Sequence, residues 1–314
     1  MRGVFAALVC AACSAPPPTV AQDLPNGAEL PSPSPAIAAD PRAEPARPPT
    51  ILDAPVQAQS LAAQPRAIDF EGVLAQGGFA RGRVRGGVPA RVTLDEMDVP
   101  VAADGSFFVA FGRDDRMMKR LSVRYEDGTD LAQSFALADT DFPESRLPPI
   151  TQKIESSPRF QARRAAELER IFAARTGRSD LDGWRQDFMR PAEGRISGVF
   201  GSQRFYGEEA RSPHSGMDIA APAGAPVIAP AAGDVVLAGG GYSFEGNLVI
   251  LDHGLGLYSA FLHLARIDVA VGDRLEQGQP LGTVGASGRA TGPHLHWGLW
   301  WNGIRFDPAA LTAR

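Results

Sequence analysis

All five histidines of this 314-residue chain lie between residues 214 and 296, and the first 213 residues contain none. His214 and Asp218 stand close together at the start of that stretch, and His294 and His296 end it. Imidazole nitrogens and carboxylate oxygens suit zinc, and three such ligands leave a fourth position open for a reactive water. If these groups form one hydrolytic metal site, the chain must fold so that two distant segments meet.

The spacing of the first two groups constrains their local structure. On a straight strand His214 and Asp218 share a face but lie about 13 Å apart, which is too far for one metal ion. A helix would make them neighbours, but Gly216 and the following Ile219–Pro222 argue against a helix. A bend around Ser215 and Gly216 is therefore required if both residues bind the same ion.

The other histidines are placed by strand alternation. His294 and His296 face the same way on a strand, roughly 6.6 Å apart along it. His263 ends the apolar segment 257–264, and alternation puts it on the face of Phe261. A histidine among apolar neighbours is usually a core residue. The other site histidines nevertheless favour a catalytic role for His263.

The fifth histidine, His253, lies in an apparent hairpin turn, Asp252–Gly256, and we interpret it as structural, with its ring bonded to the backbone. The chain has no His-Glu-x-x-His helix, which excludes the glutamate-assisted scheme of many metalloproteases. Histidines that hold no metal can replace the glutamate. A free imidazole can take a proton from metal-bound water or donate a hydrogen bond to an oxyanion.

The N-terminus has the pattern of an export signal: Arg2, a short apolar stretch over residues 4–12, then small residues. The apolar part is too short to span a bilayer permanently, so we expect a signal peptide, 1–21, and no transmembrane helix in the mature protein. Both cysteines, Cys10 and Cys13, lie in it, and the mature chain would have no thiol. Lipid anchoring through Cys13 remains an alternative. The net charge of -5 gives no electrostatic case for nucleic acid.

The rest of the N-terminal half divides by composition. Residues 22–66 are rich in proline and alanine and are predicted to be a disordered linker. Residues 67–150 are predicted to form a small antiparallel accessory β domain, because Asp104-Gly105 and Asp127-Gly128 between apolar runs are hairpin signals.

A connector and a second β region follow. Ser157-Pro158 predicts the start of a helix inside the helical connector 151–193. Its arginines, including Arg163 and Arg164, are interpreted as a solvated face rather than a contact with anionic glycan. Residues 194–314 contain many short apolar segments and glycines with almost no helical periodicity. The fold class is therefore mostly β.

The C-terminal region resembles the lysostaphin-type zinc endopeptidases of bacterial cell walls. The resemblance covers about residues 194–310. The matching segments are Phe200–Arg204, His214–Pro222, Gly246–Ile250, His253-Gly254, His263-Leu264 and Gly285–Trp297.

This resemblance implies a compact, mostly antiparallel C-terminal β domain with a groove over the metal. It also implies zinc ligands at His214, Asp218 and His296 and catalytic histidines at His263 and His294. In that scheme the two free imidazoles assist a zinc-activated water that attacks a peptide carbonyl. One departure is Phe261, where the family often has a tyrosine that could contact substrate or oxyanion.

The implied protein is a periplasmic zinc endopeptidase that hydrolyses the peptide cross-links of peptidoglycan. Its expected partners are peptidoglycan peptides, with cell-wall amidases or division proteins as further candidates. The alternative is a non-catalytic envelope activator of amidases that binds through the same groove. The complete set of ligands and catalytic histidines favours the enzyme. A zinc-dependent scaffold or adhesion protein would leave the two extra histidines unexplained.

Overall fold

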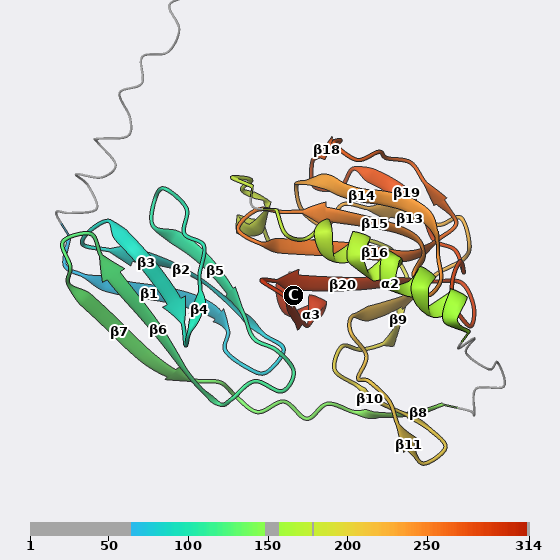
Figure 1. Ribbon diagram of the computed structural model, residues 1–314, viewed down its shortest axis with the longest axis horizontal. Coiled ribbons are helices and arrows are strands. Elements are labelled where there is room, and N and C mark those ends of the chain that lie inside the picture. Colours follow the sequence, from blue (N-terminus) through green and yellow to red (C-terminus); the bar gives the residue numbers. More distant parts are fainter. Residues whose placement is uncertain (1–63, 148–156, 178, 313–314) are drawn as a thin grey trace, which may run out of the picture. The chain divides into compact units, whose positions relative to one another are not determined.

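The computed structural model describes residues 64–147, 157–177 and 179–312 (Figure 1). The described residues all fall within a single compact unit. The predicted signal peptide 1–21, both cysteines and nearly all of the predicted linker 22–66 lie outside the described residues. In the described ranges, no helix has the length and apolar character needed to cross a membrane.

The N-terminal strands form two antiparallel sheets. A three-stranded sheet has the order β1 (Ala67–Val73), β2 (Phe79–Arg85), β5 (Ser106–Ala110), and a four-stranded sheet has the order β4 (Met97–Asp98), β3 (Pro89–Leu94), β6 (Met118–Tyr125), β7 (Asp130–Ala136). Both predicted Asp-Gly turns form, and Gly105 and Gly128 have φ values of 82° and 83°, which glycine adopts without steric cost. The expected antiparallel β structure of this region is confirmed.

One large sheet organises the C-terminal region. Its order is β18 (Arg274–Leu275), β14 (Gly233–Tyr242), β15 (Gly246–Asp252), β16 (Leu257–Leu264), β20 (His294–Trp301), β12 (Met217–Ala220), β9 (Arg195–Gly198), and β21 (Ile304–Phe306) pairs with β20. Two smaller sheets join β13 (Pro226–Ile228), β19 (Pro280–Thr283) and β17 (Arg266–Ile267), and β11 (Glu209–Ala210), β10 (Gln203–Tyr206) and β8 (Glu144–Leu147). The short helices η1 (Gly183–Arg185) and α3 (Pro308–Leu311) complete the described elements. The mostly β fold class is confirmed.

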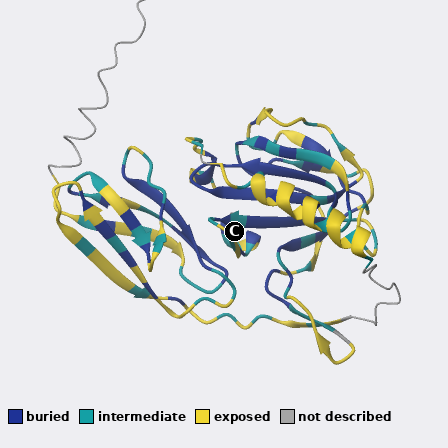
Figure 2. Ribbon diagram, in the orientation of Figure 1, coloured by how far each residue is buried: buried dark blue, intermediate teal, exposed yellow. Residues whose placement is uncertain are grey.

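The two faces of the large sheet are covered differently. Along β20, the odd-numbered residues from Leu295 to Trp301 are all fully buried in the main core. His294 and His296 alternate with them and therefore lie on the opposite face. Most of this sheet is dark blue in Figure 2, which is the colour of buried residues.

Helix α2 (Pro158–Ala173) packs on the face that carries these histidines. Ser157 caps it as predicted, since its Oγ accepts from the Phe160 N–H at 3.2 Å. Ile171 is buried in a second apolar cluster with Tyr258 and Ala260 of β16. These two residues pair with Trp300 and Gly298, which share a face with His294 and His296. The helix therefore lies beside the site histidines, in front of β15 and β16 in Figure 1.

Candidate metal centre

Strand pairing brings Asp218 beside His296. In the antiparallel ladder of β12 and β20, Asp218 is opposite His296 and Ala220 is opposite His294. His214 precedes β12 and reaches the same point because the chain bends at Gly216, as the spacing required. A Cβ at Gly216 would lie 2.4 Å from the Trp297 carbonyl oxygen and 2.8 Å from His296 Nε2. Only glycine permits this close approach.

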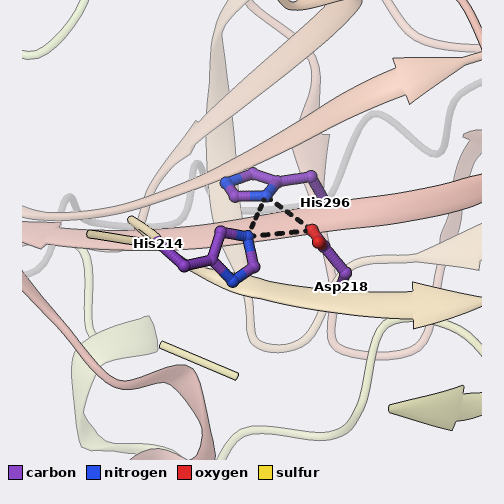
Figure 3. Close-up of side chains that lie close together, drawn as sticks. All are labelled: His214, Asp218 and His296. Atoms are coloured by element: carbon purple, nitrogen blue, oxygen red, sulfur yellow. Dashed lines mark hydrogen bonds and ion pairs between the residues drawn. The ribbon is translucent and has the colours of Figure 1, made fainter. Parts of the chain in front are cut away.

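The three predicted ligands converge on one point (Figure 3). His214 Nε2 lies 3.1 Å from Asp218 Oδ1 and 3.1 Å from His296 Nδ1, and these last two atoms are 2.7 Å apart. Tetrahedral zinc with bonds of about 2.0–2.1 Å separates its ligand atoms by about 3.3 Å. The two distances from His214 Nε2 are within a few tenths of an ångström of that value. The distance between Asp218 Oδ1 and His296 Nδ1 must increase slightly on metal binding. The donor set fits a metal ion.

Backbone contacts orient the ligands. His214 is 1% exposed, and its Nδ1–H donates to the Val199 carbonyl at 2.9 Å, which leaves the Nε2 lone pair facing Asp218. On the other side of the carboxylate, Asp218 Oδ2 lies 3.9 Å from an Nη of Arg204. A Cβ at Gly198 would come within 2.6 Å of the same oxygen. The carboxylate therefore has little room to rotate.

The electrostatics favour the protonation states that bind metal. Burial alone would raise the pKa of Asp218, but the imidazoles of His214 and His296 beside the carboxylate outweigh burial and hold that pKa well below its usual range. Burial also lowers the pKa of His296 and keeps the ring neutral at neutral pH. An ionised carboxylate and neutral imidazoles are the forms in which these groups ligate metals.

His263 and His294 lie beside the three-residue cluster, as predicted for catalytic groups. Their ring centroids are 4.8 Å apart, and His294 Nε2 is 3.9 Å from Asp218 Oδ1. Each ring donates its Nδ1–H to a backbone carbonyl at 2.8 Å, that of Ser287 for His263 and that of Gly292 for His294. In each ring this leaves Nε2 as the nitrogen available for proton transfer.

Strand alternation does not hold at His263. Phe261 pairs with Trp297 and is fully buried in the main core, so the predicted shared face would have turned His263 away from the site. Its ring instead lies 6.3 Å from that of His296. The cause is local: His263 has φ of 65°, and the pairing of β15 with β16 shifts register nearby. The left-handed residue redirects the side chain.

His253 has the structural environment expected of it. It is fully buried, and its Nδ1 bonds the Ala232 carbonyl at 2.8 Å while Nε2 bonds Ser259 Oγ at 2.7 Å. Burial lowers the pKa of His253 to about 4, so the ring stays neutral.

Two groups at the site had no role predicted from the sequence. Ser287 and Gly292 orient the rings of His263 and His294 through their carbonyls, and every residue has a carbonyl. In the sequence, only the glycines around Ser287 indicated a tight turn at this position. Gly288 has φ of 71°, and a Cβ there would lie 2.4 Å from the Gly246 nitrogen.

Comparison with known proteins defines the class. Residues 212–308 match the model of peptidase family M23. A solved structure described as a putative peptidase M23 from Pseudomonas aeruginosa is 31% identical, covers 76% of this chain and 94% of its own, and superposes with a TM-score of 0.58. The fold and the clustered ligands thus define a metallopeptidase-type domain. The chain belongs to peptidase family M23, the lysostaphin-type family that the sequence resembles.

Two curated relatives match over part of the chain. The peptidoglycan DD-endopeptidase ShyC of Vibrio cholerae is 40% identical over 119 residues, which are 37% of this chain and 27% of that protein. The cell division protein DipM of Caulobacter vibrioides is 35% identical over 125 residues, 40% of this chain and 20% of that protein. The chain thus matches less than a third of the length of either relative.

Proposed function

We propose that this protein is an exported, zinc-dependent endopeptidase that hydrolyses peptide cross-links of peptidoglycan. The observation that carries the proposal is the convergence of His214, Asp218 and His296, with ligand atoms 2.7–3.1 Å apart, beside two further imidazoles. The name of ShyC, a peptidoglycan DD-endopeptidase, supports the same substrate class.

Zinc is the metal that suits this donor set. Two imidazole nitrogens and one carboxylate oxygen, with a fourth position left for water, form a typical catalytic zinc set. When bound, zinc would polarise the substrate carbonyl and lower the pKa of its bound water.

The two remaining histidines would move the protons. Burial lowers the pKa of His263 to about 4, so at neutral pH its Nε2 is unprotonated and able to accept a proton from the attacking water. His294 is partly exposed, and its Nε2 lies 3.9 Å from Oδ1 of Asp218, one of the proposed ligand atoms. Protonated, that nitrogen would donate a hydrogen bond to the oxyanion and then a proton to the leaving amine. Phe261, buried in the core, would contribute no hydroxyl to either step.

The domain boundaries and location belong to the same proposal. Residues 194–314 would be the peptidase domain, and residues 67–150, which contain no histidine, would position it or contact a partner. The N-terminal signal pattern supports export to the periplasm, with a mature N-terminus near Gln22. A D-alanyl linkage to a diamino acid is the expected bond, in line with the DD-endopeptidase relative.

The test is digestion of purified peptidoglycan by the mature protein, followed by mass analysis of the muropeptides. We expect cross-linked dimers to become monomers while glycan strands stay intact, and chelation or Asp218→Ala to stop the conversion.

The similarity to a cell division protein gives the activator alternative its one support. If no cross-link is cut, but an added amidase is stimulated equally by the wild type and His263→Ala, the activator function replaces the enzyme.

A further inference from the structure

Helix α2 makes buried polar contacts with the turn between β14 and β15. Glu167 is 7% exposed, and its carboxylate accepts from the Ser243 N–H at 3.0 and 3.1 Å and from the Ser243 hydroxyl at 2.7 Å. Arg164 donates to both carboxylate oxygens of Glu245, at 2.6 and 2.7 Å, and to Glu167 at 3.1 Å. A bidentate, charge-assisted pair of this kind is among the strongest side-chain contacts and fixes geometry.

This pair is largely removed from solvent. The side chains of Arg164 and Glu245 are 16% and 15% exposed, while Arg163 on the same helix is 59% exposed. Two guanidinium groups lie over the Phe244 ring, with the Cζ of Arg164 at 4.6 Å and that of Arg289 at 4.3 Å from its centroid. The solvated-face interpretation therefore does not hold for Arg164. The helix fixes every residue of the turn 243–245.

The same turn holds His263. The Glu245 carbonyl accepts from the His263 backbone N–H at 2.9 Å. Just after the turn, the Asn247 N–H donates to Ser287 Oγ at 2.8 Å. The Ser287 carbonyl in turn accepts from His263 Nδ1. Both the backbone and the ring of His263 are thus bonded to groups that the turn anchors.

The conformation of His263 requires such support. Its φ of 65° lies in a region that non-glycine residues rarely occupy, and a residue persists there only when its surroundings over-determine it. A small change in this backbone would rotate the imidazole away from the metal cluster, since its direction already departs from strand alternation.

We propose that α2 is a working part of the catalytic centre, in which Arg164, through Glu245, acts as a positioning residue for His263. The inference rests on the proposed function, because it assigns His263 a role in hydrolysis. On this proposal, the activity depends on the position of α2, although the helix is far from the metal ligands in sequence. Movement of α2 away from the turn would displace His263 and lower the rate of hydrolysis while leaving the metal bound.

The full mature chain with Arg164→Ala tests this. Because a misplacement of about 1 Å at a catalytic group can cost roughly 10²-fold, we expect kcat to fall by about 10- to 100-fold, with KM and zinc content near wild type. Arg164→Lys keeps the charge but not the two-pronged contact, so its kcat should be intermediate. Arg170→Ala, an exposed arginine on the same helix, is the matched control and should leave kcat unchanged.

A double-mutant cycle identifies the pathway. Glu245→Gln retains the carbonyl that binds His263 and removes only the charged partner of Arg164. If the two residues act as a pair, the double variant should be little worse than either single variant. Multiplication of the two kcat losses would overturn the proposed pairing.

An NMR measurement of His263 does not depend on activity. The hydrogen-bonded Nδ1–H of His263 should give a protected imidazole signal in the wild type, and Arg164→Ala should shift it or increase its exchange with water. An unchanged signal, with or without a fall in kcat, would overturn the proposal. If the wild type cuts no cross-link and the signal still shifts, the positioning contact stands and the proposed function fails.

Discussion

Replacement of His253 by asparagine tests whether the structure accounts for a buried, neutral histidine. The ring fills a fully buried site between Ala232 and Ser259, with its centroid 4.8 Å from that of Phe188. Asparagine is shorter and cannot reach both partners. Leaving one of them unbonded should destabilise the variant by about 1–3 kcal/mol at neutral pH.

The difference between wild type and variant should depend on pH. In the folded protein the pKa of His253 is lowered from 6.5 to about 4 by burial. Because the folded pKa is the lower one, the unfolded chain takes up the proton first as the pH falls. The stability that His253 contributes is fully present above pH 6.5 and is lost between there and pH 4. At 1.36 kcal/mol per pKa unit, the loss is about 3 kcal/mol.

Urea unfolding of chelator-treated protein at pH 7 and pH 4 measures this. Intrinsic fluorescence of the four tryptophans reports unfolding, and the backbone N–H of one of them, Trp184, donates to the His253 carbonyl at 2.9 Å. His253→Asn should be clearly less stable than wild type at pH 7, and the gap should narrow by up to about 3 kcal/mol at pH 4. A gap that stays constant with pH would refute the assignment of a buried neutral ring.

Three further predictions concern the metal centre. Asp218→Ala should lose zinc by elemental analysis, and wild-type zinc affinity should fall as the pH drops toward imidazole protonation, because protons compete for the ligands; full occupancy in the variant would contradict the assignment. His263→Ala and His294→Ala should retain zinc but lose roughly 10²-fold or more in turnover, and wild-type rates would return either residue to a structural role. Gly198→Ala places a Cβ 2.6 Å from Asp218 Oδ2, so its zinc affinity measured by competition with a chelating dye should drop, and unchanged affinity would show that the carboxylate can move.

The sequence located the site because its chemistry requires rare residue types. The confinement of all five histidines to one region, together with Asp218, pointed to the residues that the structure brings together, with His253 as the exception. Because His214 and Asp218 would be too far apart on a straight strand, a bend between them was required, and the structure has it at Gly216. The hairpin turn around His253 and the Ser157 cap followed from turn and capping chemistry.

The features that the sequence did not reveal depend on backbone conformation and on contacts between distant segments, which residue type does not indicate. His263 was assigned to the wrong face because alternation assumes a regular ladder, and its positive φ breaks that ladder. Arg164 looks like any solvated helix arginine until Glu245, from the turn after β14, is brought beside it. The Ser287 carbonyl could not be distinguished from any other in the chain.

Anomalous diffraction at the zinc absorption edge, from crystals of the purified protein, tests the central claim most directly. The account predicts one zinc peak about 2.0–2.2 Å from His214 Nε2, Asp218 Oδ1 and His296 Nδ1, with a water at the fourth position and both His263 and His294 outside the coordination sphere. A zinc peak elsewhere, or coordination by His263 or His294 in place of a predicted ligand, would contradict it.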